Sequence, residues 1–321
     1  MPSPLRVCIV VPCYNEEGVL AHTTDVLLAQ LDSTIADGLS APDSFICCVD
    51  DGSRDNTWTE IEELSRKHAR VRGIKLSANF GHQNALIAGL FSMREAADVL
   101  VTIDADLQDD VGVITRMLQH HQQGKRVVYG VRKDRSVDAM GKRLAARLFY
   151  TLMHRMNDRS IQGHADFRSA DARVIADLER FGEANVYLRG IFPMIGYPSA
   201  VVEYVRKDRH AGGSKYSYRK LVSLAWQGIT SFSTAPLKMV FYTGIVMALF
   251  ALLLAALALW ALFTERTLQG WFSSTLIVLI FSAVNMISLG VIGEYVGKIY
   301  KEVKHRPRYI VERSTGDRPS A

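Results

Sequence analysis

Asp104 and Asp106 are separated by one residue and directly follow the apolar run Val99–Ile103. At the end of a strand, two carboxylates at this spacing can bind one hard divalent cation, directly or through water. Mg²⁺ or Mn²⁺ held by one or two carboxylates takes its other ligands from water and substrate phosphates. Such an ion neutralises the charge of a diphosphate leaving group. Solvated aspartates are also common in turns, so the pair indicates this chemistry only if other polar groups meet it.

Polar segments follow two other apolar runs. Tyr14-Asn15-Glu16 comes soon after Leu5–Val11, and Asp50-Asp51-Gly52-Ser53 adjoins Phe45–Val49. In parallel α/β sheets, ligands bind beyond the carboxyl ends of the strands. We therefore expect these two segments and the aspartate pair to line one binding site.

The elements that must position these residues alternate between strand and helix. Short apolar runs rich in β-branched residues predict buried strands, and apolar residues at helical spacing predict the helices between them. This alternation predicts a mainly parallel sheet with helices on both faces. The expected strands are 5–11, 45–49, 71–76 and 99–103, and the expected helices are 16–32, 57–68 and 83–93.

Several other chemistries lack their motifs. The first strand is followed by neither Gly-x-Gly-x-x-Gly nor a phosphate-binding loop with Lys-Ser/Thr, and no Gly-x-Ser-x-Gly occurs. No histidine stands at metal-ligand spacing from another histidine or a cysteine. His82 and His164 lie beside polar motifs and are candidates for supporting roles only.

The composition is that of a folded chain kept in a reducing compartment. The 321 residues are 48% hydrophobic and 22% charged, which excludes a disordered or low-complexity protein. The four cysteines form no regular framework, and three lie inside or beside apolar runs. We therefore expect reduced thiols and no disulfide scaffold.

Two long segments near the C-terminus carry no charged residue, Met239–Phe263 and Trp271–Gly293. A membrane-spanning helix needs about 20 apolar residues, so both segments qualify. A buried helical hairpin in a soluble core is the alternative, but the rest of the chain is short for covering two such helices. Cations precede the first segment and follow the second, so the positive-inside rule places both termini in the cytoplasm. These cations are Arg219, Lys220, Lys238, Lys298, Lys301, Lys304, Arg306 and Arg308.

The net charge of +5 is concentrated in two stretches. Residues 125–159 hold ten Lys/Arg against three Asp, and methionine or leucine recurs every fourth residue from Met140 to Met156. This pattern is typical of a basic interfacial helix, although an ordinary surface helix also fits it. Residues 199–220 include the loop Arg209–Lys215, whose Arg, Ser and Lys can bind phosphate; a plain linker is the alternative. A nucleic-acid site is disfavoured, because the chain is expected to be tethered to a bilayer and its basic runs are not interleaved with aromatic residues.

The motifs together resemble those of glycosyltransferase family 2, and more narrowly the polyprenyl-phosphate glycosyltransferases. This group comprises dolichol-phosphate mannose synthases and, with the closer likeness, bacterial undecaprenyl-phosphate glucosyltransferases. The resemblance extends from about Leu5 to Val311. It implies a Rossmann-like GT-A fold, a nucleotide-sugar donor, a Mg²⁺ or Mn²⁺ ion and a lipid-phosphate acceptor. The motifs that carry it are Val10–Glu17, Val49–Thr57, Asn79–Gln83, Asp104–Asp109, Tyr129–Arg132, Ala165–Arg168, Gly213–Tyr216 and Gly293–Lys298.

The resemblance assigns roles to matching positions. The nucleotide-sugar is expected to contact Pro12, Tyr14, Glu16, Asp51 and Gln108. The metal ligands are expected to be Asp104 and Asp106, which with Asp166 form the predicted catalytic set. The donor and acceptor phosphates are expected to meet Arg132, Arg143, Arg209, Ser214 and Lys215.

The resemblance also divides the chain into four parts. We expect a cytoplasmic GT-A catalytic domain over 1–198, and a basic loop with an amphipathic interfacial helix over 199–237. A two-span transmembrane hairpin over 238–297 and a cytoplasmic basic tail over 298–321 follow, with a disordered polar end after about Glu312. The bacterial inner (plasma) membrane is the expected location, and the paired spans offer a surface for a homo-oligomer.

The expected reaction is an inverting transfer of one hexose to a polyprenyl (undecaprenyl) phosphate, with glucose from UDP-glucose as the leading donor. GDP-mannose or a UDP-aminoarabinose derivative is the alternative. A processive polysaccharide synthase is disfavoured because Gln-x-x-Arg-Trp and further spans are absent from the sequence. A catalytically silent scaffold that binds nucleotide-sugar is opposed by the intact Asp-x-Asp motif. A basic adaptor without a small-molecule site leaves the three strand-end motifs unexplained.

Overall fold

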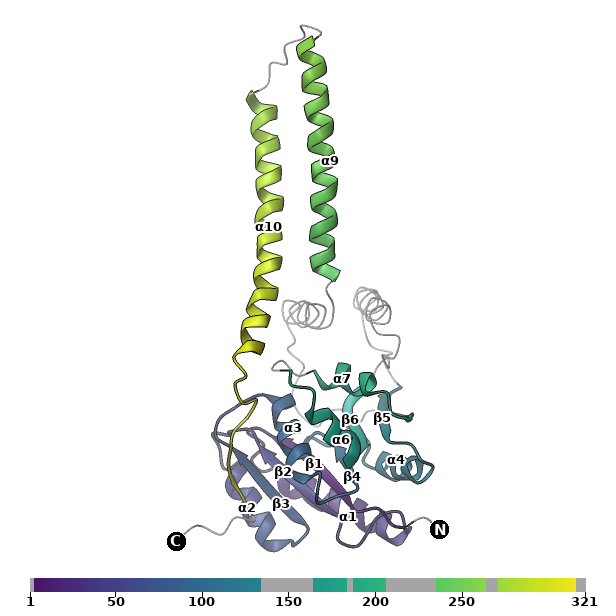
Figure 1. Cartoon of the computed structure of the whole chain (residues 1–321). Helices are drawn as coiled ribbons and strands as arrows, with labels where there is room; N and C mark the ends of the chain where they lie inside the picture. The colour runs from purple at the N-terminus through teal and green to yellow at the C-terminus, as the bar shows by residue number, and fades with distance from the viewer. Residues whose placement is uncertain (1–2, 134–163, 184–186, 206–234, 264–270, 316–321) are drawn as a thin grey trace. The chain divides into compact units, whose positions relative to one another are not determined.

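A computed structural model describes residues 3–133, 164–183, 187–205, 235–263 and 271–315. The chain forms two compact units. One comprises Met1–Ser214 with Pro307–Ala321, and the other comprises Lys215–Arg306. The first unit contains a mixed sheet with helices, and the second contains two long helices (Figure 1).

The sheet of the first unit has eight strands in the order β7-β5-β6-β4-β1-β2-β3-β8. Six of them run parallel to one another, whereas β6 and β8 run antiparallel to their neighbours. The predicted mainly parallel α/β sheet is therefore confirmed. The strands are β1 (Val7–Cys13), β2 (Phe45–Asp50), β3 (Val71–Leu76), β4 (Val99–Thr102), β5 (Val127–Arg132), β6 (His164–Asp171), β7 (Ser199–Tyr204) and β8 (Val311–Ser314).

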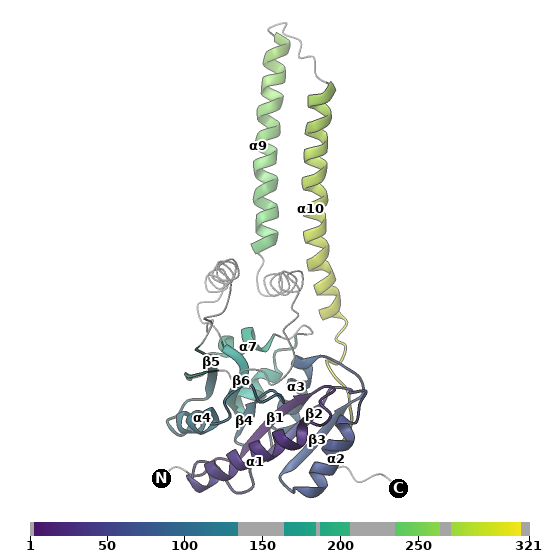
Figure 2. The ribbon, with the colours of Figure 1, turned by 180° about the vertical axis from the view of Figure 1, so that it is seen from behind.

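The helices cover both faces of the sheet, which can be compared in Figures 1 and 2. On one face, alternate residues of β1 pack with apolar residues of α1, α2 and α4. On the other face, Gly89 of α3 lies so close to Val10 and Val49 that a Cβ atom there would meet both side chains. The helices are α1 (Leu20–Ala36), α2 (Thr57–Lys67), α3 (His82–Met93), α4 (Val113–Gln122), α6 (Ala172–Glu179) and α7 (Leu188–Ile195).

The antiparallel direction of β6 has a direct consequence for the site. Its residue Arg168 pairs with Thr102, the last residue of β4. The first residues of β6 therefore lie at the edge of the sheet where the parallel strands end. Asp166, which precedes Arg168 by two residues, is brought to the same edge as the Asp-x-Asp motif.

The first predicted helix begins later than expected, at Leu20 instead of Glu16. Strand β1 continues through Pro12 to Cys13, and the chain then turns at Asn15, whose φ is +54°. Asparagine tolerates this left-handed backbone because its short side chain forms local hydrogen bonds. The polar residues 14–16 thus lie in a loop and not in the first turn of a helix.

The sheet extends beyond the expected catalytic boundary at residue 198. Strand β7 pairs in parallel with β5, and β8 pairs with β3 although it follows the two long helices in sequence. Thr315 closes this end, because its amide donates to the Gly73 carbonyl at 3.0 Å while its hydroxyl accepts from the Gly73 amide at 2.9 Å. The expectation of a disordered end after about Glu312 is therefore wrong for residues 313–315.

The second unit contains α9 (Ala235–Phe263) and α10 (Trp271–Val303). Each is long and apolar enough to cross a membrane, over Pro236–Leu257 with mean hydropathy 2.5 and over Ile280–Val303 with mean hydropathy 1.4. Neither window is buried in the structure, unlike the core helices of a soluble protein. The two predicted apolar helices are confirmed as candidate spans, and α10 continues past Gly293 into charged residues.

Candidate active site

The Asp-x-Asp motif forms a tight turn after β4. Ala105 is buried, and its carbonyl accepts a hydrogen bond from Thr23 of α1 at 2.7 Å. Asp106 is exposed on one side of this anchor, and the Asp104 side chain is 38% exposed on the other. Leu107 then adopts a φ of +48°, and this turn lets the Gln108 side-chain amide donate to Asp106 at 2.6 Å. Left-handed backbone is costly for leucine, so surrounding contacts hold the two carboxylates in a preset geometry.

The Asp50–Ser53 turn lies at the same edge of the sheet. Both carboxylate oxygens of Asp51 accept backbone hydrogen bonds, from Phe80 at 2.7 Å and from Gly81 at 2.9 Å. Burial raises the pKa of Asp51, while these two amides act to lower it. A Cβ atom on Gly52, whose φ is +66°, would lie 2.4 Å from the Ala78 carbonyl carbon. Asp51 therefore anchors the loop before α3, a contact that the sequence did not signal.

The loop after β1 is tied to the start of α2. The Asn15 backbone amide donates to Ser53 Oγ at 3.0 Å, and the Asn15 side chain accepts from the Arg54 amide at 2.9 Å. The Glu16 amide donates to Thr57 at 2.9 Å. These bonds join the first two predicted motifs, as the sequence led us to expect. Among the predicted nucleotide contacts, Pro12 is buried whereas Tyr14 is 42% exposed.

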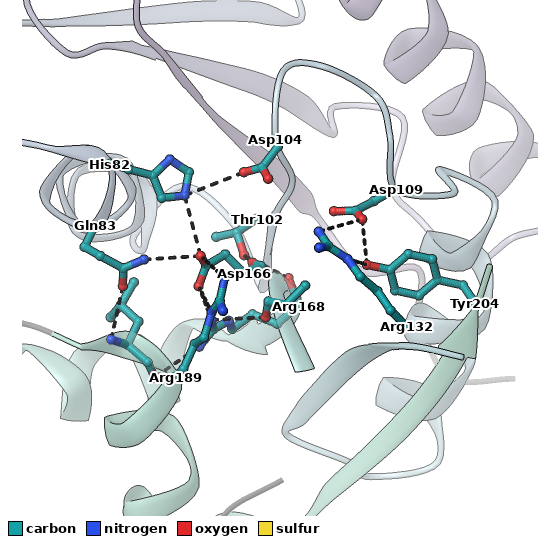
Figure 3. Close-up of polar contacts among 12 residues, drawn as sticks. His82, Gln83, Thr102, Asp104, Asp109, Arg132, Asp166, Arg168, Arg189 and Tyr204 are labelled. Carbon is teal, nitrogen blue, oxygen red and sulfur yellow. Dashed lines mark hydrogen bonds and ion pairs between the residues drawn. The ribbon is translucent and has the colours of Figure 1, made fainter. Parts of the chain in front are cut away.

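Asp166 is the centre of a dense group of cations (Figure 3). Its carboxylate accepts two hydrogen bonds from Arg189 of α7, at 2.9 and 3.1 Å, and one from the buried Arg168 at 2.8 Å. Gln83 donates to it at 3.3 Å and also accepts the Leu188 amide at 3.1 Å. Burial alone would raise the pKa of Asp166, but His82, Arg168 and Arg189 hold it well below its usual range.

His82, the first residue of α3, lies between two carboxylates. Its Nε2 atom is 3.6 Å from Asp104 and 3.7 Å from Asp166. Burial lowers the pKa of His82, but Asp166 and Asp104 raise it above its ordinary value. The pKa of Asp104 is raised by burial and by the charges of Asp166 and Asp109, against the lowering effect of His82. The histidine therefore bridges the predicted metal ligand and the Asp166 group.

A second group of contacts surrounds Asp109. Its Oδ1 atom accepts from Arg132 Nη2 at 3.1 Å and from the Tyr204 hydroxyl at 2.7 Å. Arg132 Nε also donates to the Tyr204 hydroxyl, at 3.2 Å. Asp109 is buried, whereas the Arg132 side chain is 28% exposed. Arg132, which is a predicted phosphate ligand, therefore lies at the carboxyl edge of the sheet. It is the last residue of β5 and pairs in register with Tyr204 of β7.

The structure brings together most, but not all, of the predicted site residues. Pro12, Asp51, Asp104, Arg132 and Asp166 all lie at or beside the carboxyl edge. Arg143, Arg209 and Ser214 lie outside the described residues, as do Lys215 and the expected basic and juxtamembrane helices.

Sequence reasoning missed four side chains that complete these groups. They are Gln83, Arg168, Arg189 and Tyr204. Gln83 and Arg168 stand inside quoted motifs, so a search for polar partners within those motifs would have found them. Arg189 and Tyr204 have no such signal, because each meets its carboxylate through tertiary structure alone.

The donor set fits a divalent cation that is bound only in part by protein. Among the described residues, no three His, Cys, Asp or Glu side chains are arranged to hold a metal ion by themselves. Two carboxylates from one turn suit Mg²⁺ or Mn²⁺ that takes its other ligands from phosphate and water. The neighbouring negative charges that raise the pKa of Asp104 also favour a cation at this position.

The fold and this acidic strand-end site define an α/β protein whose candidate active site lies at the carboxyl ends of the parallel strands. A model of the family Glycosyl transferase family 2 matches residues 8–177, which is more than half of the chain. The chain therefore belongs to glycosyltransferase family 2 and is a glycosyltransferase. The matched segment includes β1 to β6 and therefore the Asp104, Asp109 and Asp166 groups.

Two curated relatives align with nearly the whole chain. The uncharacterized glycosyltransferase YkoT of Bacillus subtilis (strain 168) is 44% identical over 308 residues, which cover 95% of this chain and 90% of the relative. The SfII prophage-derived bactoprenol glucosyl transferase of Shigella flexneri is 34% identical over 317 residues, or 98% and 100% of the two chains. Among solved structures, mannosyltransferase PcManGT from Pyrobaculum calidifontis in complex with GDP-Man and Mn²⁺ matches with a TM-score of 0.45 and 15% identity, covering 90% of this chain and 88% of that one.

Proposed function

We propose that this protein transfers one glucose from UDP-glucose to a polyprenyl phosphate, with inversion at the anomeric carbon and with Mg²⁺ or Mn²⁺ bound at Asp104 and Asp106. The observation that carries the proposal is the near full-length similarity to a bactoprenol glucosyl transferase combined with the acidic strand-end site. The two apolar helices supply the membrane attachment that a lipid acceptor requires. GDP-mannose or a UDP-aminoarabinose derivative is the alternative donor.

The cation would neutralise the diphosphate as UDP departs. Pro12, Tyr14, Glu16, Asp51 and Gln108 are the proposed surroundings of the nucleotide. Asp51 acts there by holding the loop before α3, because its two oxygens already accept backbone hydrogen bonds. Arg132 is proposed to bind a phosphate, together with Arg143, Arg209, Ser214 and Lys215.

Asp166 is proposed to orient groups and not to accept a proton. Three guanidinium hydrogen bonds hold it as a carboxylate, and a group held in this state by nearby cations is a weak base. The reaction does not require a strong base either. A phosphate monoester has its second pKa near about 6, so an acceptor phosphate is already mostly dianionic at neutral pH.

The proposed topology places the catalytic unit and both termini on the cytoplasmic side of the bacterial plasma membrane. It rests on the cations before α9 and after the apolar part of α10, which include Lys238 and Lys301. A homo-oligomer is proposed from the paired apolar helices. Cysteine labelling at an introduced residue before Lys238 tests the topology, because it must react only from the cytoplasmic side.

The donor and the stereochemistry can be tested in one preparation. Detergent-purified protein is incubated with undecaprenyl phosphate and either UDP-glucose, GDP-mannose or a UDP-aminoarabinose derivative, with and without EDTA. The proposal expects one sugar on the lipid from UDP-glucose, a product of inverted anomeric configuration by NMR, and loss of product with EDTA. Transfer from another donor would correct the sugar assignment alone. Retained configuration or full activity in EDTA would contradict the mechanism.

A further inference from the structure

We propose that Asp109 and Tyr204 are positioning residues that aim the Arg132 guanidinium at a substrate phosphate. The proposal rests on the proposed function, because it takes Arg132 as a phosphate ligand. It adds two residues to the site for which the resemblance to known enzymes assigned no role. Figure 3 shows the three side chains as a group separate from the one around Asp166.

The three side chains form a closed ring of hydrogen bonds. Arg132 Nε donates to the Tyr204 hydroxyl, the hydroxyl donates to Asp109 Oδ1, and the same oxygen accepts from Arg132 Nη2. Two of the five guanidinium N–H groups are thereby used, and the plane of the guanidinium is fixed. The other N–H groups take no part in this ring, and the Arg132 side chain as a whole is 28% exposed.

Tyr204 is held from its other sides by apolar contacts. Its ring packs edge-on against Phe167, with 5.6 Å between centroids and an interplanar angle of 82°. Gly130 leaves room for the ring, since a Cβ atom there would lie 3.0 Å from Tyr204 Cε1. Burial and Asp109 raise the pKa of Tyr204, so its hydroxyl remains a donor at neutral pH. These contacts fix the position of the Tyr204 hydroxyl beside Arg132.

The ring also connects the metal-motif turn with two strand ends. Asp109 lies three residues after Asp106, while Arg132 and Tyr204 are the last residues of β5 and β7 and pair with each other in register. A long arginine side chain without such support loses considerable conformational freedom when it binds an anion. Fixing it beforehand removes that cost from substrate binding. The expected benefit is therefore a lower KM or a higher kcat/KM for the substrate that carries the phosphate.

Tyr204→Phe is the sharpest test, because it removes the hydroxyl and keeps the packing against Phe167. We expect kcat/KM to fall about tenfold, the loss typical of one hydrogen bond to a charged group. KM values for UDP-glucose and for undecaprenyl phosphate, measured separately, tell whether the donor or the acceptor phosphate is involved. Tyr197→Phe is the matched control, because it removes a 2.6 Å hydrogen bond from a tyrosine to Asp177 outside this ring. It should leave both KM values unchanged.

A double variant separates positioning from general damage. Arg132→Gln should raise one KM, and adding Tyr204→Phe to it should cause no further change if the tyrosine acts through the arginine. Equal effects of Tyr204→Phe with and without Arg132 would overturn the proposal, and so would unchanged kinetics of Tyr204→Phe beside an impaired Arg132→Gln. Unchanged kinetics of Arg132→Gln itself would instead remove the phosphate role of Arg132 from the proposed function, and the positioning role with it.

Discussion

Strand β6 carries an ion-paired aspartate at each end of the sheet, and the two ends differ in the exposure of the histidine beside each aspartate, since the His82 side chain is 44% exposed and the His121 side chain is 1% exposed. At the open end, Asp166 pairs with Arg189, whose side chain is 41% exposed, and His82 stands beside it. At the other end, which we call the sealed end, Asp171 pairs with Arg126, and with His121 at 2.7 Å. The same combination of Asp, Arg and His thus occurs at both ends of β6, with the aspartate supplied by the strand and these cations by other parts of the chain.

The sealed end even contains the order of groups used in nucleophilic catalysis. One ring nitrogen of His121 forms a hydrogen bond with Asp171, and the other forms a hydrogen bond with Ser169 Oγ at 2.8 Å. Ser169 has no exposed surface and the His121 side chain is 1% exposed, so no substrate reaches the serine. We interpret this group as structural, because its hydrogen bonds join α4 to β6. Residue types and distances therefore define a functional site only where the groups are accessible.

The largest effect on activity is expected at the open end from Asp104→Asn. The substitution removes one carboxylate from the proposed metal site, and loss of several kcal/mol of charge stabilisation lowers the rate by about 100-fold or more. Glycolipid formation measures the rate, and electron paramagnetic resonance of Mn²⁺ measures binding. Asp104 is 38% exposed, so the melting temperature should remain close to that of the wild type. Full activity with unaltered Mn²⁺ binding would refute the metal assignment.

Arg189→Met should lower kcat by about tenfold. The variant frees Asp166 from two charge-assisted hydrogen bonds, and Asp166 then loses its fixed orientation while Arg168 still pairs with it. Steady-state kinetics on UDP-glucose and undecaprenyl phosphate measure the change. If Asp166 and Arg189 act as one unit, the effects of Arg189→Met and Asp166→Asn on kcat should not add in the double variant. A kcat equal to that of the wild type would exclude the orienting role.

His121→Ala should reduce stability and not catalysis. It removes the hydrogen-bond partner of the buried Ser169 hydroxyl and leaves Asp171 paired with Arg126, which costs about 2–3 kcal/mol and lowers the melting temperature by about 5–10 °C. Thermal unfolding measures the shift, and His22→Ala on the exposed surface of α1 is the control. Turnover per folded molecule should stay within about twofold. A large loss of turnover in a stable variant would show that the sealed end takes part in the reaction.

The smallest effect is expected from Arg126→Met, which matches Arg189→Met at the sealed end. The Arg126 side chain is 50% exposed, and exposed ion pairs contribute at most about 1 kcal/mol. Activity should be unchanged and the melting temperature only slightly lower. Comparing the two methionine variants in one assay sharpens the contrast between the ends, and equal losses of activity would abolish it.

The elements that the sequence analysis predicted well are those whose residues are uniformly apolar. Strand β1 and its neighbours β2 and β4 are buried on both faces, so their composition marks them directly. The two long C-terminal helices were predicted from their charge-free length for the same reason. The Asp-x-Asp turn was then placed correctly, because it follows one of these strands.

Two of the elements that were missed, β6 and β8, are polar and depend on distant partners. Strand β6 reads His-Ala-Asp-Phe-Arg-Ser-Ala-Asp, and its charges are buried only because arginines and histidines from other elements meet them. Strand β8 has four residues, of which two are charged, and it pairs with Lys75 and other residues of β3 from the far end of the chain. Local periodicity carries no information about such pairings, so Arg189 and Tyr204 were not expected at the site.

The central claim is that the open end of the sheet joins a hexose to a polyprenyl phosphate, and mass spectrometry of the lipid tests it most directly. Wild-type protein and Asp104→Asn, matched for melting temperature, are incubated with undecaprenyl phosphate, UDP-glucose and Mn²⁺ or Mg²⁺. The proposed function predicts one added hexose with the wild type and almost none with the variant. An unchanged lipid in the wild-type reaction, despite measurable binding of UDP-glucose, would contradict it and favour a nucleotide-sugar-binding scaffold.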